Sequence, residues 1–300
     1  AAGFARIAPA PTAAMVLPLG LPDLPFHLRL DALSAVFLLL LGGATVAISL
    51  FSAGYFRASE GTAPGTVCFQ YHAFLAAMAL VLVADDAYVF MVAWETMALA
   101  SFFLVTTDHR LPEIRRAGFL YLLIAHVGAL AILLCFGVLQ GGSGDYTFAG
   151  MRAATLSPAW ASIGFFLALF GFGAKAGILP LHVWLPEAHP AAPSPVSALM
   201  SGVMLKTAIY GLLRVAFDLL QLQLWWWGVV ALAFGLVTAL FGVIFAAAQT
   251  DMKRLIAYAA INHAGVIAIG LAVGKGTTYG VLMYVISNAL IKAILFLTAG

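Results

Sequence analysis

Long apolar stretches separated by short polar turns occupy almost the whole chain after residue 30. A helix needs about 20 apolar residues to cross a bilayer, and most of these stretches reach that length. They are continuous runs rather than alternating positions, which argues against a membrane β-barrel. The pattern predicts an all-α, polytopic transmembrane helix bundle of about nine helices. The predicted spans are residues 31–54, 70–84, 87–107, 115–140, 158–178, 194–217, 223–249, 253–273 and 277–299.

The segment between the fifth and sixth predicted helices, AKAGILPLHVWLPEAHPAAPSPVSA, carries five prolines within sixteen positions. Each proline removes a backbone hydrogen-bond donor. Unpaired backbone at membrane depth is tolerated only inside protein or beside a water-filled cavity. We therefore predict a broken helix next to Lys175, with a plain connecting loop as the alternative.

The composition supports a bilayer as the solvent, because 64% of the residues are hydrophobic and only 9% are charged. Soluble domains carry about 25% charged residues. A formal net charge of +2 gives no sign of a nucleic-acid partner. Cys68 and Cys135 form no metal-ligand motif, so neither a metal site nor a cofactor is expected.

The two ends of the chain differ from its apolar middle. Residues 1–29 are rich in alanine and proline and predict an N-terminal loop or extra-membrane segment. Residues 30–69 predict a flanking transmembrane helix and a loop. The chain does not begin with methionine and stops inside an apolar run, so we expect it to be truncated at both ends.

Three charged residues, Glu95, Lys175 and Lys206, fall inside predicted helices. A charge at the centre of a bilayer costs about 2.5–3.5 kcal/mol on insertion scales, so such residues face a polar interior and commonly serve transport. Glu95 beside Lys175 would lower the cost of burying both, and a buried lysine that loses its partner can release a proton. The alternative is a static ion pair that fixes helix packing.

His263 and Lys292 are further candidates for a proton relay. His263 lies about 15 Å into the eighth span, and a histidine can pass protons near neutral pH. Lys292 follows Asn288 by one helical turn on the same face. The alternatives are a hydrogen-bonded core histidine and a lysine that reaches back to the membrane surface. Three other histidines, at positions 126, 182 and 189, receive no individual role, because such residues usually bond neighbouring helices.

Basic residues in the connecting segments gather slightly on one side of the membrane. This side has Arg57, Arg110, Arg115, Arg116, Lys253 and Arg254. The positive-inside rule places it in the cytoplasm. No phosphate loop, hydrolase motif or iron–sulfur cysteine set is present, so the chain is not expected to carry a redox centre of its own.

The stretch KAGILPLHVWLPEAHPAAPSPVSALMSGVMLKTAIYGLLR closely resembles proton-conducting, antiporter-like membrane subunits. Such subunits occur in respiratory complex I, cation/proton antiporters and membrane-bound nickel–iron hydrogenases. Supporting stretches are AWETMALASFFLV, AQTDMKRLIAYAAINHAG and NALIKAILFLTAG, and the likeness covers about residues 28–300. The chain looks most like the branch with hydrogenase-4 component B and the formate hydrogenlyase membrane subunit.

The resemblance implies site residues and a repeat organisation. Its charged positions match Glu95, Lys175, Lys206 and Lys292, and its later histidine position matches His263. It implies inverted five-helix repeats, each with a broken helix: a first repeat at 70–217 and a partial second repeat at 218–300. The family often has histidines where this chain has Tyr284 and Asn288.

The resemblance also implies a function. We expect a proton-translocating subunit of a redox-driven complex, either a membrane-bound nickel–iron hydrogenase or a complex I-like assembly, in the inner (plasma) membrane. Its partners would be an electron-transfer arm, further antiporter-like subunits and the lipid bilayer. The alternatives are a sodium or potassium/proton antiporter subunit and a non-conducting membrane scaffold.

Overall fold

A computed structural model describes residues 13–56 and 64–300, which leaves Arg57 and residues 1–12 outside the described part. In the described residues nine helical segments are long and apolar enough to cross a membrane, as predicted. They are α1 (Ala32–Tyr55), α2 (Pro64–Val83), α3 (Ala87–Val105), α4 (Pro112–Leu139), α6 (Pro158–Ala176), the composite span Ser194–Leu219, α10 (Trp225–Ala247), α11 (Met252–Ala272) and α12 (Thr278–Thr298).

The composite span and the connections contain shorter elements. Ser194–Leu219 consists of α8 (Ser194–Leu199), the π-helical turn η1 (Met200–Met204), α9 (Leu205–Leu213) and a second π-helical turn η2 (Arg214–Leu219). The other short elements are β1 (Ala13–Leu21), β2 (Leu24–Leu30), α5 (Phe148–Ala153), α7 (Leu185–Ala191) and the 3₁₀ turn η3 (Lys275–Thr277).

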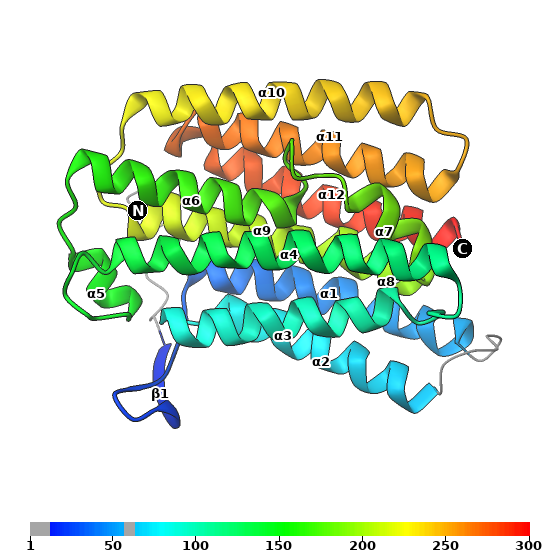
Figure 1. Ribbon diagram of the computed structural model, residues 1–300, viewed down its shortest axis with the longest axis horizontal. Helices are drawn as coiled ribbons and strands as arrows, with labels where there is room; N and C mark the ends of the chain where they lie inside the picture. Colours follow the sequence, from blue (N-terminus) through cyan, green and yellow to red (C-terminus); the bar gives the residue numbers. More distant parts are fainter. Residues whose placement is uncertain (1–12, 57–63) are drawn as a thin grey trace.

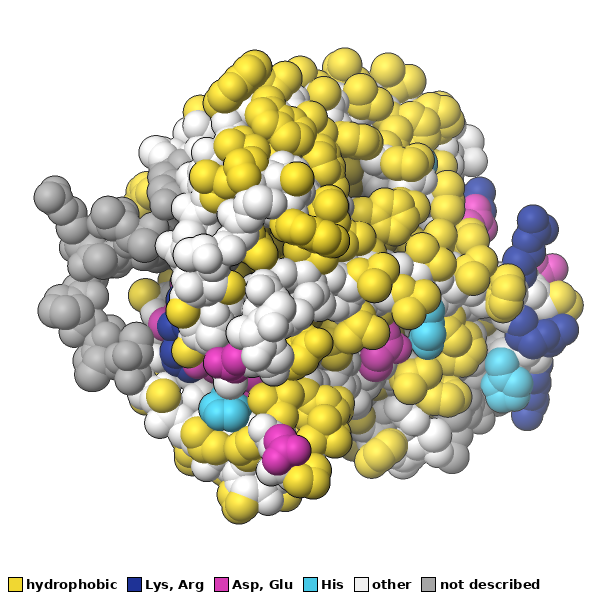
Figure 2. Space-filling model, turned by 60° about the vertical axis from the view of Figure 1, so that its left-hand side comes forward, with side chains coloured by type: hydrophobic (Ala, Val, Ile, Leu, Met, Phe, Trp, Pro, Cys, Tyr) yellow, Lys and Arg dark blue, Asp and Glu magenta, His cyan; other side chains and the backbone are white. Residues whose placement is uncertain are grey.

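The long helices lie side by side in one bundle, with α1, α2 and α3 along one side and α10, α11 and α12 along the other (Figure 1). The composite span is the enclosed centre, because its apolar window is 100% buried, whereas that of α10 is 28% buried. Hydrophobic side chains cover most of the face in Figure 2, and Lys and Arg side chains gather at one edge of it. The chain is a multi-pass membrane protein.

Polar residues set where several helices begin. The carboxylate of Asp31 accepts a hydrogen bond from the Ser34 backbone N–H and caps α1. Asp86 caps α3 in the same way by accepting from Val89 N–H at 2.7 Å. An N-cap carboxylate satisfies N–H groups that have no partner inside the helix.

Two sequence predictions need correction. The second span was predicted at 70–84, but α2 begins at Pro64, because proline is compatible with the first helical turn and the polar residues after it continue the helix. Residues 1–29 were predicted as an N-terminal loop or extra-membrane segment, but in the described part of this range β1 and β2 pair as an antiparallel hairpin rather than a loop. The β1 strand is largely exposed, so its sequence lacks the alternation of apolar and polar residues that predicts a half-buried strand.

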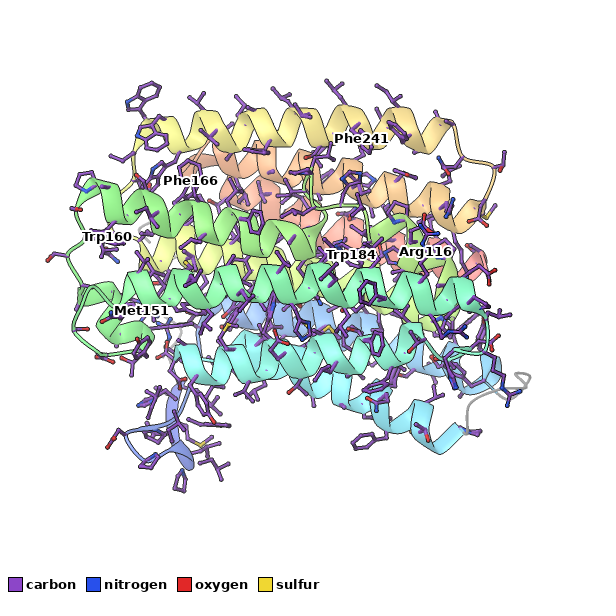
Figure 3. All side chains as sticks on the ribbon, in the orientation of Figure 1. Arg116, Met151, Trp160, Phe166, Trp184 and Phe241 are labelled. Atoms are coloured by element: carbon purple, nitrogen blue, oxygen red, sulfur yellow. The ribbon has the colours of Figure 1, made fainter. Side chains whose placement is uncertain are left out.

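The predicted broken helix is confirmed. The α6 helix ends at Gly177, whose φ of 84° lies in the left-handed region that glycine tolerates. The N–H of Ile178 turns back to the Gly173 carbonyl, and the indole N–H of Trp184 donates to the Ala174 carbonyl at 2.8 Å. Trp184 therefore takes the place of a backbone donor at the break, where Figure 3 shows it inside the bundle.

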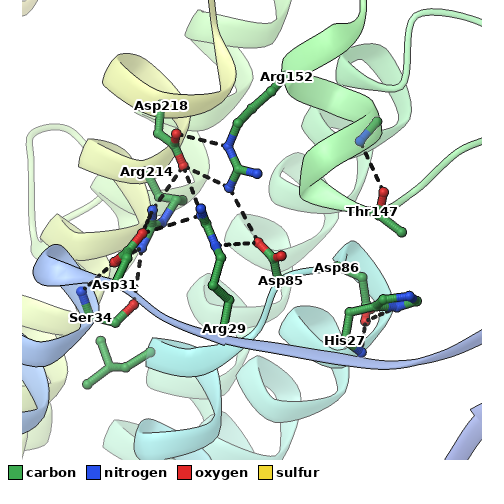
Figure 4. Close-up of polar contacts among 12 residues, drawn as sticks. His27, Arg29, Asp31, Ser34, Asp85, Asp86, Thr147, Arg152, Arg214 and Asp218 are labelled. Atoms are coloured by element: carbon green, nitrogen blue, oxygen red, sulfur yellow. Dashed lines mark hydrogen bonds and ion pairs between the residues drawn. The ribbon is translucent and has the colours of Figure 1, made fainter. Parts of the chain in front are cut away.

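Six charged side chains join at the end of the bundle that carries the hairpin (Figure 4). This end cluster consists of Arg29, Asp31, Asp85, Arg152, Arg214 and Asp218. Its contacts include Arg214 Nη1 to Asp31 Oδ2 at 2.6 Å, Arg29 Nε to Asp85 Oδ1 at 2.9 Å, and Arg152 Nε to Asp218 Oδ1 at 2.9 Å. The cluster ties β2, α1, the α2–α3 turn, α5 and η2 together.

The end cluster predicts a loss of stability in acid. Burial alone would raise the pKa of Asp31, but the hydrogen bonds and charge of Arg214 outweigh burial and hold that pKa well below its ordinary value of 3.8. A carboxyl with a depressed pKa stabilises the folded state above its unfolded pKa, and this contribution is lost as the pH falls below it. We expect thermal unfolding temperatures that hold steady above about pH 4 and drop below it. Asp31→Asn should flatten that drop, and an unchanged acid profile would contradict the assignment.

Candidate functional site

Lys175 lies near the end of α6 and is only 2% exposed. Its Nζ donates a hydrogen bond to Tyr121 Oη of α4 at 2.7 Å. Tyr121 Oη is in turn 2.5 Å from Ser101 Oγ of α3, whose hydroxyl also donates to the Met97 carbonyl. Three helices therefore converge on one buried ammonium group through hydroxyl groups.

The predicted direct pairing of Glu95 with Lys175 is not formed in the described residues. Glu95 lies near the middle of α3, and its Oε2 is 3.4 Å from His126 Nε2 of α4. The side chains of Glu95 and His126 are 33% and 48% exposed, so they lie on an outer face of the α3–α4 pair. Lys175 is within electrostatic range of Glu95, but Tyr121 is its hydrogen-bond partner.

Lys206 follows the π-helical turn η1 and is 3% exposed. Its Nζ donates to the Ser201 backbone carbonyl at 2.7 Å. A π-helical turn bonds five residues back rather than four, and such turns are frequent at functional sites. The turn here provides a carbonyl for an ammonium group in the enclosed centre of the bundle.

Lys292 is 2% exposed and donates to the Ile256 carbonyl of α11 at 3.3 Å, so it does not reach back to the membrane surface. His263 of α11 is hydrogen-bonded through Nδ1 to the hydroxyl of Tyr284 on α12. The tyrosine that stands where the resembled family often has histidine is therefore a direct partner of the predicted relay histidine.

His189, in the short helix α7, completes a second buried cluster. Its ring is fully buried and stacks on Phe296 with centroids 4.6 Å apart, and neither ring nitrogen has a hydrogen-bond partner among the described residues. It lies within electrostatic range of Lys206 and Lys292, which are also within range of each other. His263 lies within range of the same two lysines.

Further polar atoms in the elements that meet here are buried without a partner in the described structure. They are Ser194 Oγ, Ser201 Oγ and Asn288 Oδ1. Buried polar atoms in proteins are nearly always bonded to protein or to water. We call the group of His189, Ser201, Lys206, Asn288 and Lys292 the central compartment.

The structure thus divides the predicted site residues into two groups. Lys206, His263 and Lys292 belong around the central compartment, whereas Lys175 lies with Tyr121 and Ser101. Trp184 stands between the groups, since its ring packs 4.9 Å from that of Tyr121 and 6.5 Å from that of His189. No direct hydrogen bond joins the two groups in the residues that the structure describes. In the same residues, no cluster of His, Cys, Asp and Glu could hold a metal ion.

Sequence reasoning missed Tyr121 and gave no role to His189. Tyr121 is uncharged and lies in an apolar helix, so only the spatial neighbour Lys175 reveals it. For His189 there was a usable signal, because it lies in the proline-rich break that predicted a polar pocket.

Comparison with known proteins identifies the family to which this chain belongs. The family model described as "NADH:quinone oxidoreductase/Mrp antiporter, TM" matches residues 84–300. The chain belongs to this family. The resemblance drawn from the proline-and-lysine stretch is confirmed, and every lysine and histidine of the two groups lies within the matched region.

Individual members of the antiporter-like family extend the match. Hydrogenase-4 component B of Escherichia coli is 44% identical over 288 residues, which cover 91% of this chain and 43% of that protein. A chain of the Mrp complex from Dietzia sp. superposes with a TM-score of 0.86 at 28% identity, covering 98% of this chain and 32% of that one. A chain of an archaeal membrane-bound sulfane sulfur reductase superposes with a TM-score of 0.82 at 27% identity, and the match covers 99% of this chain and 49% of that one. The chain spans less than half the length of each.

Proposed function

We propose that this chain translocates protons as an antiporter-like subunit of a redox-driven membrane complex in the bacterial plasma membrane. The observation that carries the proposal is the central compartment, where the fully buried His189 lies within electrostatic range of the buried Lys206 and Lys292 and has no hydrogen-bond partner among the described residues. A static packing role would leave each polar group bonded, because an unsatisfied buried group costs about 1–3 kcal/mol.

The first transfer site in this proposal is Lys175. When Nζ carries its proton, it donates to Tyr121 Oη; after the proton leaves, the neutral amine can accept a hydrogen bond from the same hydroxyl. The hydroxyl of Ser101 extends this chain toward α3. Tyr121 thus keeps both protonation states of Lys175 hydrogen-bonded inside the bilayer.

Transfer through the central compartment would use internal water. His189 can take up a proton on one nitrogen and release it from the other, and Lys206 and Lys292 both lie within electrostatic range of it. The hydroxyl of Ser201 and the amide oxygen of Asn288 are available to hold bridging water. His263 and its partner Tyr284 continue the polar path along α11 and α12.

The proposal requires partner subunits. An electron-transfer arm would supply the energy, and further antiporter-like subunits would lie beside this chain in the membrane. Glu95 and His126 are partly exposed near the middle of their helices, where a neighbouring subunit would shield them from lipid.

Lys206→Met tests the proposal directly. In vesicles containing the assembled complex, electron-driven proton uptake should fall below about one tenth of the wild-type rate, because methionine keeps the volume but cannot hold a proton. A pH-sensitive dye would report uptake, and Arg116→Met, which removes an exposed charge near the start of α4, serves as the control. Unchanged uptake in the Lys206 variant would instead identify a scaffold.

A sodium or potassium/proton antiporter subunit is the second candidate, favoured by the close superposition on a chain of the Mrp complex. The same vesicles separate the two functions. Proton movement that follows an imposed sodium or potassium gradient, and does not respond to an electron donor, would select the antiporter.

A further inference from the structure

A groove opens at the membrane surface where α2, the end of α3 and the start of α4 diverge. Its volume is about 520 Å³, within the range of ligand sites. Its walls are formed mainly by Val67 of α2, Phe102 and Phe103 of α3, and Phe119 and Leu122 of α4. Phe103 and Phe119 are exposed, so the groove faces the lipid phase rather than the proton path.

A fixed positive charge stands at the mouth of this groove. Arg115 lines it, and its Nη1 donates to the backbone carbonyls of His109 at 2.8 Å and Arg110 at 3.0 Å. These bonds hold the guanidinium in place and occupy one of its three nitrogens. Leu122 is seven residues further along α4, about 10 Å deeper in the membrane. The groove therefore runs from a cation at the surface to aromatic and aliphatic walls below.

The backbone at the mouth adds to the positive potential. The α4 helix begins at Pro112 without a side-chain cap, so its first-turn N–H groups and the positive end of its dipole point toward this surface. Two acidic side chains nearby, Asp108 and Glu113, are exposed and do not line the groove.

We propose that this groove binds an anionic phospholipid, with an acyl chain along Phe102, Phe119 and Leu122 and the phosphate against Arg115. Basic pockets between membrane helices bind anionic headgroups in this way. A lipid is favoured over a partner helix because the groove combines apolar walls with a fixed guanidinium at its mouth, the arrangement of an acyl chain and its headgroup. A free phosphate ion would make no use of the apolar walls.

The test uses full-length, delipidated protein and native mass spectrometry with phosphatidylglycerol and phosphatidylcholine of identical chains. Phosphatidylglycerol should bind at least about fivefold more tightly, because each arginine near the surface favours an anionic headgroup. Arg115→Gln should remove that preference. Arg116→Gln, which removes an equal charge from the same end of α4 outside the groove lining, should keep it (Figure 3).

Two further measurements distinguish the contribution of the acyl chain to binding from that of the headgroup. Leu122→Trp should narrow the groove and weaken binding of both lipids, whereas Leu134→Trp, at an exposed position elsewhere on α4, should not. Equal binding of the two lipids by the wild type, or equal losses in the Arg115 and Arg116 variants, would overturn the proposal. Displacement of the lipid by millimolar inorganic phosphate alone would assign the site to free phosphate and also overturn it.

Discussion

Lys175→Met is expected to abolish coupled proton movement while the complex still assembles. Lys175 is buried at the helix break and holds the only side-chain ammonium in the described Tyr121–Ser101 network, so methionine removes the proton carrier while filling a similar volume. Proton uptake per electron transferred should fall below about one tenth of the wild-type ratio. Assembly on native gels and the rate of electron transfer in the presence of an uncoupler check that the complex is intact.

Lys175→Arg and Tyr121→Phe distinguish a proton carrier from a static charge. Arginine keeps the positive charge but does not deprotonate in proteins, so it should not restore proton uptake. Phenylalanine removes the hydroxyl that bonds both protonation states, and we expect uptake to slow by about tenfold without being abolished. Full recovery with arginine would show that Lys175 only fixes helix packing.

Arg214→Ala is expected to destabilise the fold more than any other single change in the end cluster. Arg214 is 4% exposed and bonds Asp31, Asp218, Ser34 and Tyr210. Removing it leaves Asp31 without its main partner and takes one of three arginines from Asp218, and breaking a buried pair costs about 3–5 kcal/mol. Because Asp218 keeps some contact with solvent, we expect a loss near the lower end, measured by denaturant unfolding in nanodiscs.

The chain offers a matched control at its opposite end. Arg254 pairs with Glu187 at 2.7 Å, but both side chains are more than 40% exposed. Exposed pairs contribute less than about 1 kcal/mol, so Arg254→Ala should change little. Adding Asp31→Asn to Arg214→Ala should recover part of the stability, because the orphaned charge is then gone. Similar losses for Arg214→Ala and Arg254→Ala would contradict the role of the end cluster.

The length of the hydrophobic runs was enough to predict the spans, and the cluster of prolines was enough to predict the interrupted helix. Both predictions use local sequence, because a bilayer requires a minimum apolar length and paired backbone groups within each segment. The buried charges were found for the same reason, since Lys175, Lys206 and Lys292 stand out against apolar neighbours. The pairing of those charges could not be predicted. It depends on which way α3 and α4 are rotated, and that rotation directs Glu95 to His126 rather than to Lys175.

The end cluster shows a second limit. Its six residues come from four separate parts of the chain, and each residue alone looks like an ordinary surface charge in the sequence. Only the return of β2, α5 and η2 to one end of the bundle makes them neighbours. The inverted repeats at 70–217 and 218–300 stay a prediction.

The enclosed position of the span Ser194–Leu219 has a consequence for biogenesis. Its α8 and η1 segments pack against α12, which is synthesised about eighty residues later. During insertion, the helix that carries Lys206 must therefore wait beside lipid or a chaperone until α12 arrives. The enclosure of α8 and η1, and with it the proposed proton path, is therefore completed only after α12 has been inserted.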